Sequence, residues 1–194
     1  MHPALCAAVS RLSYEGRLTS VPAAARRSLD GVAPGVSCVL VPHHGNAVAS
    51  VEEADEVVAQ VRAVLGREWS DGEARPLRQD DVVVVAAYNA QVWTIRRALE
   101  ASGLGAVRVG TVDKYQGQQA VVSIVSTAAS SADDVPRGME FLLNRNRINV
   151  AVSRAQWCAV IVRSAGLTEY LPRAPEGLAE LGAFVGLCDG ARGA

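Results

Sequence analysis

Two blocks of residues in the second half of the chain carry side chains suited to phosphate chemistry. The first block, residues 110–119, reads GTVDKYQGQQ, and the second, residues 144–155, reads NRNRINVAVSRA. In the first block, Thr111 can offer a hydroxyl group and a backbone N–H to a phosphate oxygen. The Gln116–Gly117 step lets the backbone approach a ligand closely, because glycine has no Cβ. A polar surface turn is the alternative interpretation, but a protein core would not require so long a string of consecutive polar residues.

The second block is suited to holding a cation beside a phosphate. Asn144, Arg147 and Arg154 are separated by three and seven positions, which predicts one face of a continuous helix. The inward face of that helix would carry Ile148, Val152 and Ala155. An arginine finger presented in this way offsets charge on a transferring phosphoryl group and contributes on the order of 10³–10⁵ in rate in GTPases. The alternative is an ordinary amphipathic helix with solvated arginines.

The loop that normally cradles the phosphates of a nucleotide is missing from these 194 residues. Such a loop needs a Gly-Lys-Ser/Thr sequence, and the lysine of this chain, Lys114, stands between Asp113 and Tyr115. The formal net charge of −1 gives no global electrostatic argument for a nucleic-acid partner. Contacts with phosphate must therefore come from local groups.

The distribution of cysteine and histidine argues against a metal site. The four cysteines are far apart and form no Cys-x-x-Cys pair: Cys6, Cys38, Cys158 and Cys188. We expect them to be core thiols in a reducing cytoplasm. The adjacent His43 and His44 predict a solvated turn, because neighbouring histidines cannot both face one metal from regular structure. The start of the chain lacks the pattern of a signal peptide, and no apolar run approaches the ~20 residues of a membrane span, so no membrane partner is expected.

The elements that must position these blocks alternate between strand and helix. Five β-branched or apolar runs predict strands, at residues 36–41, 81–86, 107–109, 121–126 and 159–162. A Ser-x-x-Glu capping box at Ser50 and Glu53 predicts a helix that stops at Gly66. A second helix follows a turn at residues 88–91 and ends near Gly103. Loops are expected at residues 67–80, with Trp69 as an anchor, and at residues 128–138, where the segment looks mobile.

This alternation predicts an α/β domain with a mainly parallel sheet flanked by helices. The run at residues 81–86 is apolar throughout, as in a strand buried on both faces. We expect a single domain at residues 36–165, preceded by a connecting segment at residues 1–35. The tail at residues 166–194 is expected to form a helix packed on the domain.

The two blocks resemble motifs V and VI of superfamily 1 helicases. Residues 86–91, AAYNAQ, are similar to the Thr-Pro-Tyr-Asn-x-Gln motif of that group. The opening MHPAL and the later YEGRL at residues 14–18 resemble its Gln-Tyr-Arg-Met-His-Pro motif and a following Tyr-Glu-Gly-x-Leu. Four ordered segments within residues 1–163 match. The resemblance is strongest to superfamily 1B helicases of the nonsense-mediated-decay and Okazaki nuclease–helicase type, nearest to bacterial fusions with a RecB-like nuclease.

The resemblance implies a fold, partners and roles for particular residues. It implies a RecA-like (P-loop NTPase-type) lobe that lacks its own Walker A motif and completes an ATP site with a first RecA-like lobe, in cis or in trans. Arg154 would contact the γ-phosphate, while ATP and Mg²⁺ would be held mainly by the first lobe. The residues that would border ATP are Gln116, Gly117, Gln119 and Arg154. The residues that would grip single-stranded DNA, with RNA left open, are Thr111, Tyr88 and Asn89.

The sequence departs from the family pattern at several positions. Gln119 stands where the family usually carries a glutamate, and Ala87 where it carries a proline. Met1 coincides with a methionine internal to a motif, which indicates a truncated reading frame, a decayed gene or a misplaced start codon. Because the resemblance implies that ATP is hydrolysed between two lobes, the isolated chain is expected to be inactive as an ATPase. The alternatives are a non-catalytic nucleic-acid-binding or regulatory module, a gene remnant, or a nucleotide-binding α/β protein of another kind.

Overall fold

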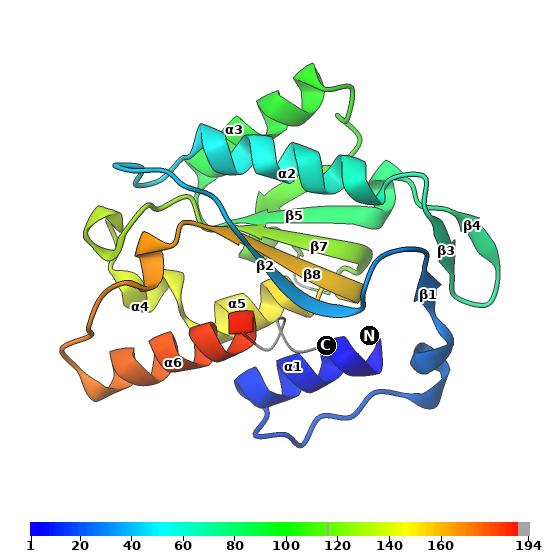
Figure 1. Cartoon of the computed structure of the whole chain (residues 1–194), viewed down its shortest axis with the longest axis horizontal. Coiled ribbons are helices and arrows are strands. Elements are labelled where there is room, and N and C mark those ends of the chain that lie inside the picture. Colours follow the sequence, from blue (N-terminus) through cyan, green and yellow to red (C-terminus); the bar gives the residue numbers. More distant parts are fainter. Residues whose placement is uncertain (116, 190–194) are drawn as a thin grey trace.

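A parallel five-stranded sheet forms the centre of the protein, in a computed structural model that describes residues 1–115 and 117–189. Its strands lie in the order β2-β8-β7-β5-β6, and all neighbours run parallel (Figure 1). They are β2 (Gly35–Leu40), β8 (Ala155–Arg163), β7 (Ala120–Ser126), β5 (Val82–Ala86) and β6 (Arg108–Thr111). Every residue of β5 and β7 is buried, because both faces of these central strands are covered. The prediction of an α/β domain with a mainly parallel sheet is confirmed.

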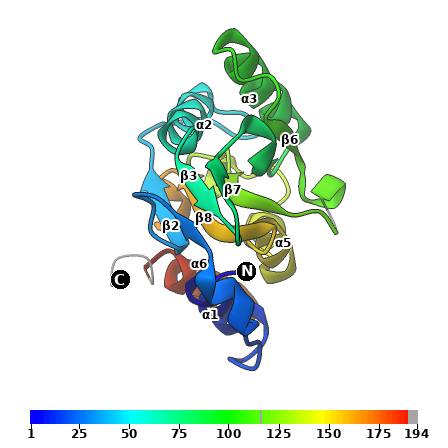
Figure 2. The ribbon, with the colours of Figure 1, turned by 90° about the vertical axis from the view of Figure 1, so that its right-hand side faces the viewer.

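Helices cover both faces of the sheet. The connecting segments lie where the strands begin, called the amino edge below, and where they end, called the carboxyl edge. One face packs against α2 (Val51–Val64) and α3 (Asn89–Ala101), and the other against α1 (Pro3–Ser13), α5 (Arg145–Val152) and α6 (Pro175–Asp189) (Figure 2). A short helix, α4 (Met139–Leu142), precedes α5. In the part of the chain that the structure describes, no helix is long and apolar enough to span a membrane.

A second, small antiparallel sheet lies beside the amino end of β8. Two of its three strands lie within residues 67–80, for which the sequence predicted a loop. It consists of β1 (Ser28–Leu29), β3 (Glu68–Ser70) and β4 (Ala74–Pro76). Trp69 is 3% exposed and meets the ring of Trp157 edge-on at 6.2 Å. The prediction that Trp69 anchors this segment is therefore confirmed, whereas the prediction of a loop at residues 67–80 was wrong. The hairpin forms because it has the buried indole of a distant strand to pack against.

The segment that looked mobile is also packed in its first part. Ala128 and Ala129 are fully buried, and Ser130 donates its backbone N–H to the carbonyl oxygen of Asn46 at 2.8 Å. A short 3-10 helix then follows at Ala132–Asp134. The polar composition of residues 128–138 concealed this burial, since the hydrogen-bond partners of the segment come from the loop after β2 and from α2.

The cysteines lead to a prediction about thiol reactivity. Cys6, Cys158 and Cys188 are buried, and Cys38 is half-buried. Burial raises the pKa of Cys158 to about 12. The pKa of Cys188 is also raised, first by its contact with Cys38 and then by burial. Because the thiolate is the reactive form, we expect Cys158 to resist iodoacetamide at pH 8 in the native protein and to react after unfolding in urea. Mass spectrometry of the labelled peptides measures this, and native labelling of Cys158 as fast as that of Cys38 would contradict it.

Candidate ATP and nucleic-acid contacts at the two strand edges

The structure gathers the predicted nucleic-acid contacts at the carboxyl edge of the sheet. Tyr88 and Asn89 follow the end of β5 at Ala86 by two and three residues, and Thr111 is the last residue of β6. The two strands are in register there, with Ala86 opposite Thr111. Asn89 is exposed at the start of α3, whereas Tyr88 is half-buried. This is the edge at which ligands are expected in a doubly wound sheet.

The predicted ATP contacts lie instead at the amino edge. Gln119 immediately precedes β7 and Arg154 immediately precedes β8, and the first residues of these strands are paired, Ala120 with Ala155. Gly117 has a φ of +81°, in the left-handed region where glycine is favoured. Gln116 lies outside the described residues. The set of predicted site residues is thus divided between two opposite edges, which strand position alone did not foresee.

Arg154 is not on the helix that carries the rest of its block. Helix α5 ends at Val152, and Arg154 occupies the turn that leads into β8. The prediction of one continuous helical face from Asn144 to Arg154 was therefore wrong; Asn144 is the N-cap residue, whose side chain accepts from the backbone N–H groups of the first turn. Pairing of β8 with β7 ends the helix two residues before Arg154.

The guanidinium of Arg154 is held by its own chain. Its Nε donates to the carbonyl oxygen of Val150 at 2.8 Å, and one terminal nitrogen donates to those of Tyr115 and Gln118, both at 3.2 Å. The other terminal nitrogen donates to Ser153 Oγ at 3.1 Å. These bonds use four of the five N–H groups of an arginine. They join the first block to the second, and they direct the cation at Tyr115 and Gln118 rather than at a neighbouring surface.

The amino edge offers donors for an anion and few ligands for a metal. The exposed Gln119 side chain accepts from Gln156 Nε2 at 3.2 Å, and its backbone carbonyl accepts from Arg108 at 3.1 Å. Among the described residues, no group of three or more His, Cys, Asp or Glu side chains is placed to hold a metal ion. Guanidinium and amide groups fit the phosphates of a nucleotide, whereas Mg²⁺ prefers carboxylate and water oxygens.

A buried polar network behind the carboxyl edge was missed from the sequence. His43, predicted to be solvated, is 4% exposed; its Nε2 is 3.1 Å from Glu53 Oε1 and its Nδ1 is 2.7 Å from Ser130 Oγ. Glu53 also accepts from Ser126 Oγ at 2.6 Å, from Thr127 Oγ1 at 3.1 Å and from the backbone N–H of Ala128 at 2.9 Å. The carboxylate thus fixes the chain just beyond the end of β7.

The capping box that suggested a simple role for Glu53 is only half formed. Ser50 Oγ accepts from the backbone N–H of Glu53 at 3.0 Å, as predicted. The backbone N–H of Ser50, however, donates to Gln91 Oε1 at 2.7 Å and not to Glu53. A sequence signal was present, since Glu53 lies next to Ala54 and four positions before Val57 on the inward stripe of α2.

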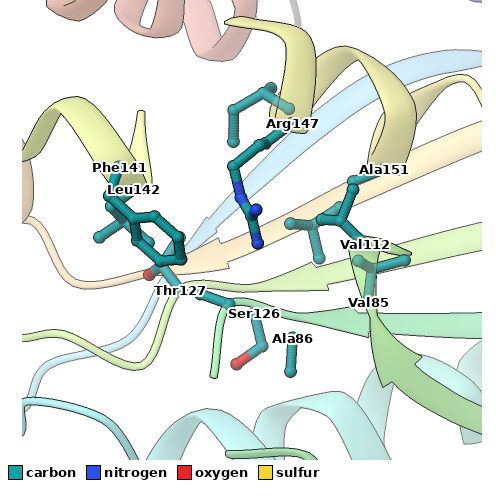
Figure 3. Close-up of a pocket in the computed structure, with 12 residues that line it drawn as sticks. Val85, Ala86, Val112, Ser126, Thr127, Phe141, Leu142, Arg147 and Ala151 are labelled. Atoms are coloured by element: carbon teal, nitrogen blue, oxygen red, sulfur yellow. The ribbon is translucent and has the colours of Figure 1, made fainter. Parts of the chain in front are cut away.

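A hollow at the carboxyl edge of the sheet is lined by the side chain of Arg147. Figure 3 shows the side chain of Arg147 projecting from α5 toward the ends of β5 and β7, beside the ring of Phe141. Ala86, Ser126 and Thr127 line the opposite wall. The sequence predicted Arg147 only as a member of a helix face, and it predicted no role for Phe141.

A five-stranded parallel sheet of this order, flanked by helices on both faces, defines a RecA-like α/β domain. The chain matches the family described as AAA domain (AAA_12) over residues 1–165, and it belongs to that family.

Curated relatives of this chain include several helicases. It is 32% identical over 124 residues to putative helicase mov-10-B.1 of Danio rerio, covering 58% of this chain and 12% of that protein. It is 30% identical over 184 residues to the human 3'-5' exoribonuclease HELZ2, covering 80% of this chain and 6% of the relative. It is 35% identical over 92 residues to the DNA replication ATP-dependent helicase/nuclease DNA2 of Mus musculus, covering 47% of this chain and 8% of that protein. The chain is therefore a superfamily 1 helicase-type domain that spans a small part of each of these relatives.

Proposed function

We propose that this chain is the second motor lobe of an ATP-dependent helicase of superfamily 1B, of the type fused to a RecB-like nuclease. The observation that carries the proposal is the contact between the two sequence blocks, made by the Arg154 guanidinium on the carbonyl oxygens of Tyr115 and Gln118. Because the Arg154 side chain contacts both blocks, it can transmit a conformational change at the amino edge to the segment that begins at Thr111 on the carboxyl edge. Such a link is what a motor needs to couple nucleotide hydrolysis to its grip on a strand.

Thr111, Tyr88 and Asn89 would hold the backbone of single-stranded DNA, or of RNA, at the carboxyl edge. A hydroxyl, an aromatic ring and an amide offer phosphate, sugar and stacking contacts without reading base edges. A motor that moves along any sequence requires contacts of this kind. The printed names of the relatives include both a DNA helicase/nuclease and an exoribonuclease, so both nucleic acids belong in the test.

At the amino edge, Arg154 would place its charge beside the phosphates of ATP, with Gln116, Gly117 and Gln119 as neighbours. Bound ATP supplies the phosphoryl group that is transferred to water. Because four of its N–H groups are engaged, Arg154 has to release loop carbonyls to form a bidentate contact. With no acidic cluster among the described residues, Mg²⁺ and most of the nucleotide contacts would come from a first RecA-like lobe.

The test is the ATPase rate of this chain with single-stranded DNA, alone and mixed with a separately expressed first lobe from a relative. We expect no rate above background from the chain alone, because a RecA-like ATP site is built by two lobes. We expect ATP hydrolysis on mixing, stimulated by single-stranded DNA or RNA. Background rates in the mixture, with circular dichroism showing that both parts are folded, would overturn the proposal.

A non-catalytic nucleic-acid-binding module is the second candidate. It is favoured by the engagement of four of the five N–H groups of Arg154 within the chain, since a module without ATPase function could retain the arginine as a structural tie. Such a module would bind single strands without any ATPase activity on mixing. A gene remnant would show neither binding nor hydrolysis.

A further inference from the structure

Two guanidinium groups are stacked on one aromatic ring at the carboxyl edge, apart from the contacts assigned above. The Cζ atoms of Arg137 and Arg147 lie 3.9 and 4.4 Å from the centroid of the Phe141 ring. The ring of Tyr88 lies 5.8 Å from that of Phe141. Cation–π contact orients the planar guanidinium groups against the ring, so that their N–H edges remain free to face a ligand.

Neither arginine forms an ion pair with a described residue. The ion pairs there include no Arg137 or Arg147. No described residue accepts a hydrogen bond from the Arg147 side chain, although it is only half-exposed and points into the hollow shown in Figure 3. A partly desolvated cation without an anionic partner is disfavoured, which raises the question of what anion normally faces it.

The hydroxyl group of Tyr88 poses the same question. Its oxygen is buried and has no hydrogen-bond partner among the residues that the structure describes. Burial raises the pKa of Tyr88, while the charges of Arg137 and Arg147 act in the opposite direction, so the hydroxyl lies in the field of both cations. A protonated phenol and two guanidinium groups are donors, and no described residue accepts a hydrogen bond from them. A buried donor without an acceptor is uncommon in proteins and calls for a missing partner.

We propose that Tyr88, Arg137 and Arg147, braced by Phe141, clamp a backbone phosphate of the single strand. A phosphodiester carries one negative charge and acceptor oxygens that match the arginine fork. The guanidinium groups cover the Phe141 ring, so the ring serves as a brace and not as a platform for a base. The proposal rests on the function proposed above and adds Arg137, Phe141 and Arg147 to the strand contacts.

The position of the cluster favours a strand phosphate over the phosphates of ATP. Arg147 faces Ala86 and Ser126 at the ends of β5 and β7, on the same edge as Thr111 and Asn89. Arg154 and Gln119 lie at the beginnings of β8 and β7, on the opposite edge. A ligand that runs past Thr111 and Tyr88 meets the cluster, whereas a nucleotide beside Arg154 does not.

Fluorescence anisotropy with a labelled oligo-dT, across a series of salt concentrations, tests the proposal on the whole chain. For Arg147→Gln we expect about tenfold weaker binding at low salt. The slope of log K against log salt should fall by about 0.7, the value for one phosphate contact on a single strand. Arg147→Lys should bind between the two. Arg62→Gln, an equal charge change on the exposed last turn of α2, should match the wild type.

Two further arms identify the ligand. With an oligonucleotide that carries neutral methylphosphonate linkages, the difference between wild type and Arg147→Gln should vanish. With ATP as the titrant, the two proteins should be alike. Equal binding of the charged oligonucleotide by wild type and Arg147→Gln overturns the clamp alone, and so does an effect of the variant on ATP only. Failure of the wild type to bind any oligonucleotide overturns the clamp and the proposed strand grip together.

Discussion

Arg154→Ala is expected to reduce the ATPase rate of the mixed lobes by roughly 10³-fold or more, to background. A cation beside the transferring phosphoryl group contributes about 10³–10⁵ in rate where arginine fingers have been assigned, and alanine leaves no charge in its place. The measurement is the steady-state rate with saturating single-stranded DNA. Oligonucleotide binding should change little, since Arg154 lies on the edge opposite to Thr111 and Tyr88.

The same substitution removes structural bonds, so the experiment needs a control that separates the two roles. Loss of the bonds to Val150, Tyr115 and Gln118 is expected to lower the free energy of unfolding by about 1–3 kcal/mol, at ~1 kcal/mol or less for each half-exposed hydrogen bond. Arg154→Lys keeps the charge but cannot form the fork, and should retain measurable activity. Ser153→Ala removes one bond to the guanidinium and should leave the rate within about twofold.

An Arg154→Ala rate above about a tenth of the wild-type rate would mean that Arg154 is a tie between two loops and not a finger. An equal loss of activity in Arg154→Ala and Ser153→Ala would lead to the same conclusion. If Arg154→Ala is inactive and Arg154→Lys is partly active, with both variants folded, the charge itself is what the reaction requires.

The central strands could be predicted from the sequence because their residues are almost all apolar, as in strands buried on both faces. The valine run at Val82–Ala86 leaves no polar face, and a strand without one belongs in the middle of a parallel sheet. The small sheet could not be predicted in the same way. β3 and β4 have a polar, glycine- and proline-punctuated sequence, and the packing of Trp69 against Trp157 joins positions far apart in the chain.

The candidate site was predictable in its residue types but not in its geometry. Helical spacing grouped Asn144, Arg147 and Arg154, yet α5 ends at Val152 because the next residues pair with β7. Tertiary pairing overrides local helical preference at this point. The structure places Thr111 at the end of β6 and Arg154 just before β8. The distribution of the predicted contacts over two edges depends on the direction of the strands, which only the three-dimensional arrangement supplies.

Glu53 shows why a satisfied local pattern can hide a long-range role. The Ser-x-x-Glu sequence accounts for both residues at the start of α2 and predicts no further partner. In the structure the carboxylate is fully buried and accepts hydrogen bonds from residues more than seventy positions away. Distant donors of this kind leave no periodic signal in the sequence.

Glu53→Gln is expected to lower the free energy of unfolding by about 3–5 kcal/mol, because it disturbs several buried hydrogen bonds, each contributing about 1.5–3 kcal/mol when the acceptor is charged. Serine, threonine and backbone donors face the carboxylate from β7 and the residue after it. A glutamine amide would turn an NH₂ group toward one of them. Ala128, whose φ is +68°, would lose the bond that holds its strained backbone. Urea unfolding followed by circular dichroism measures the change.

Asp55→Asn is the matched control, because Asp55 is exposed on the same helix; its effect should stay within about 0.5 kcal/mol. Ser126→Ala removes one donor to the carboxylate and should cost about 1 kcal/mol, which keeps the test informative if Glu53→Gln does not fold. A Glu53→Gln effect below about 1 kcal/mol would show that the network does not hold the end of β7. Because Ser126 and Thr127 both bond to Glu53 and line the hollow that receives Arg147, folded Glu53→Gln protein should also bind oligo-dT more weakly, while Asp55→Asn should not.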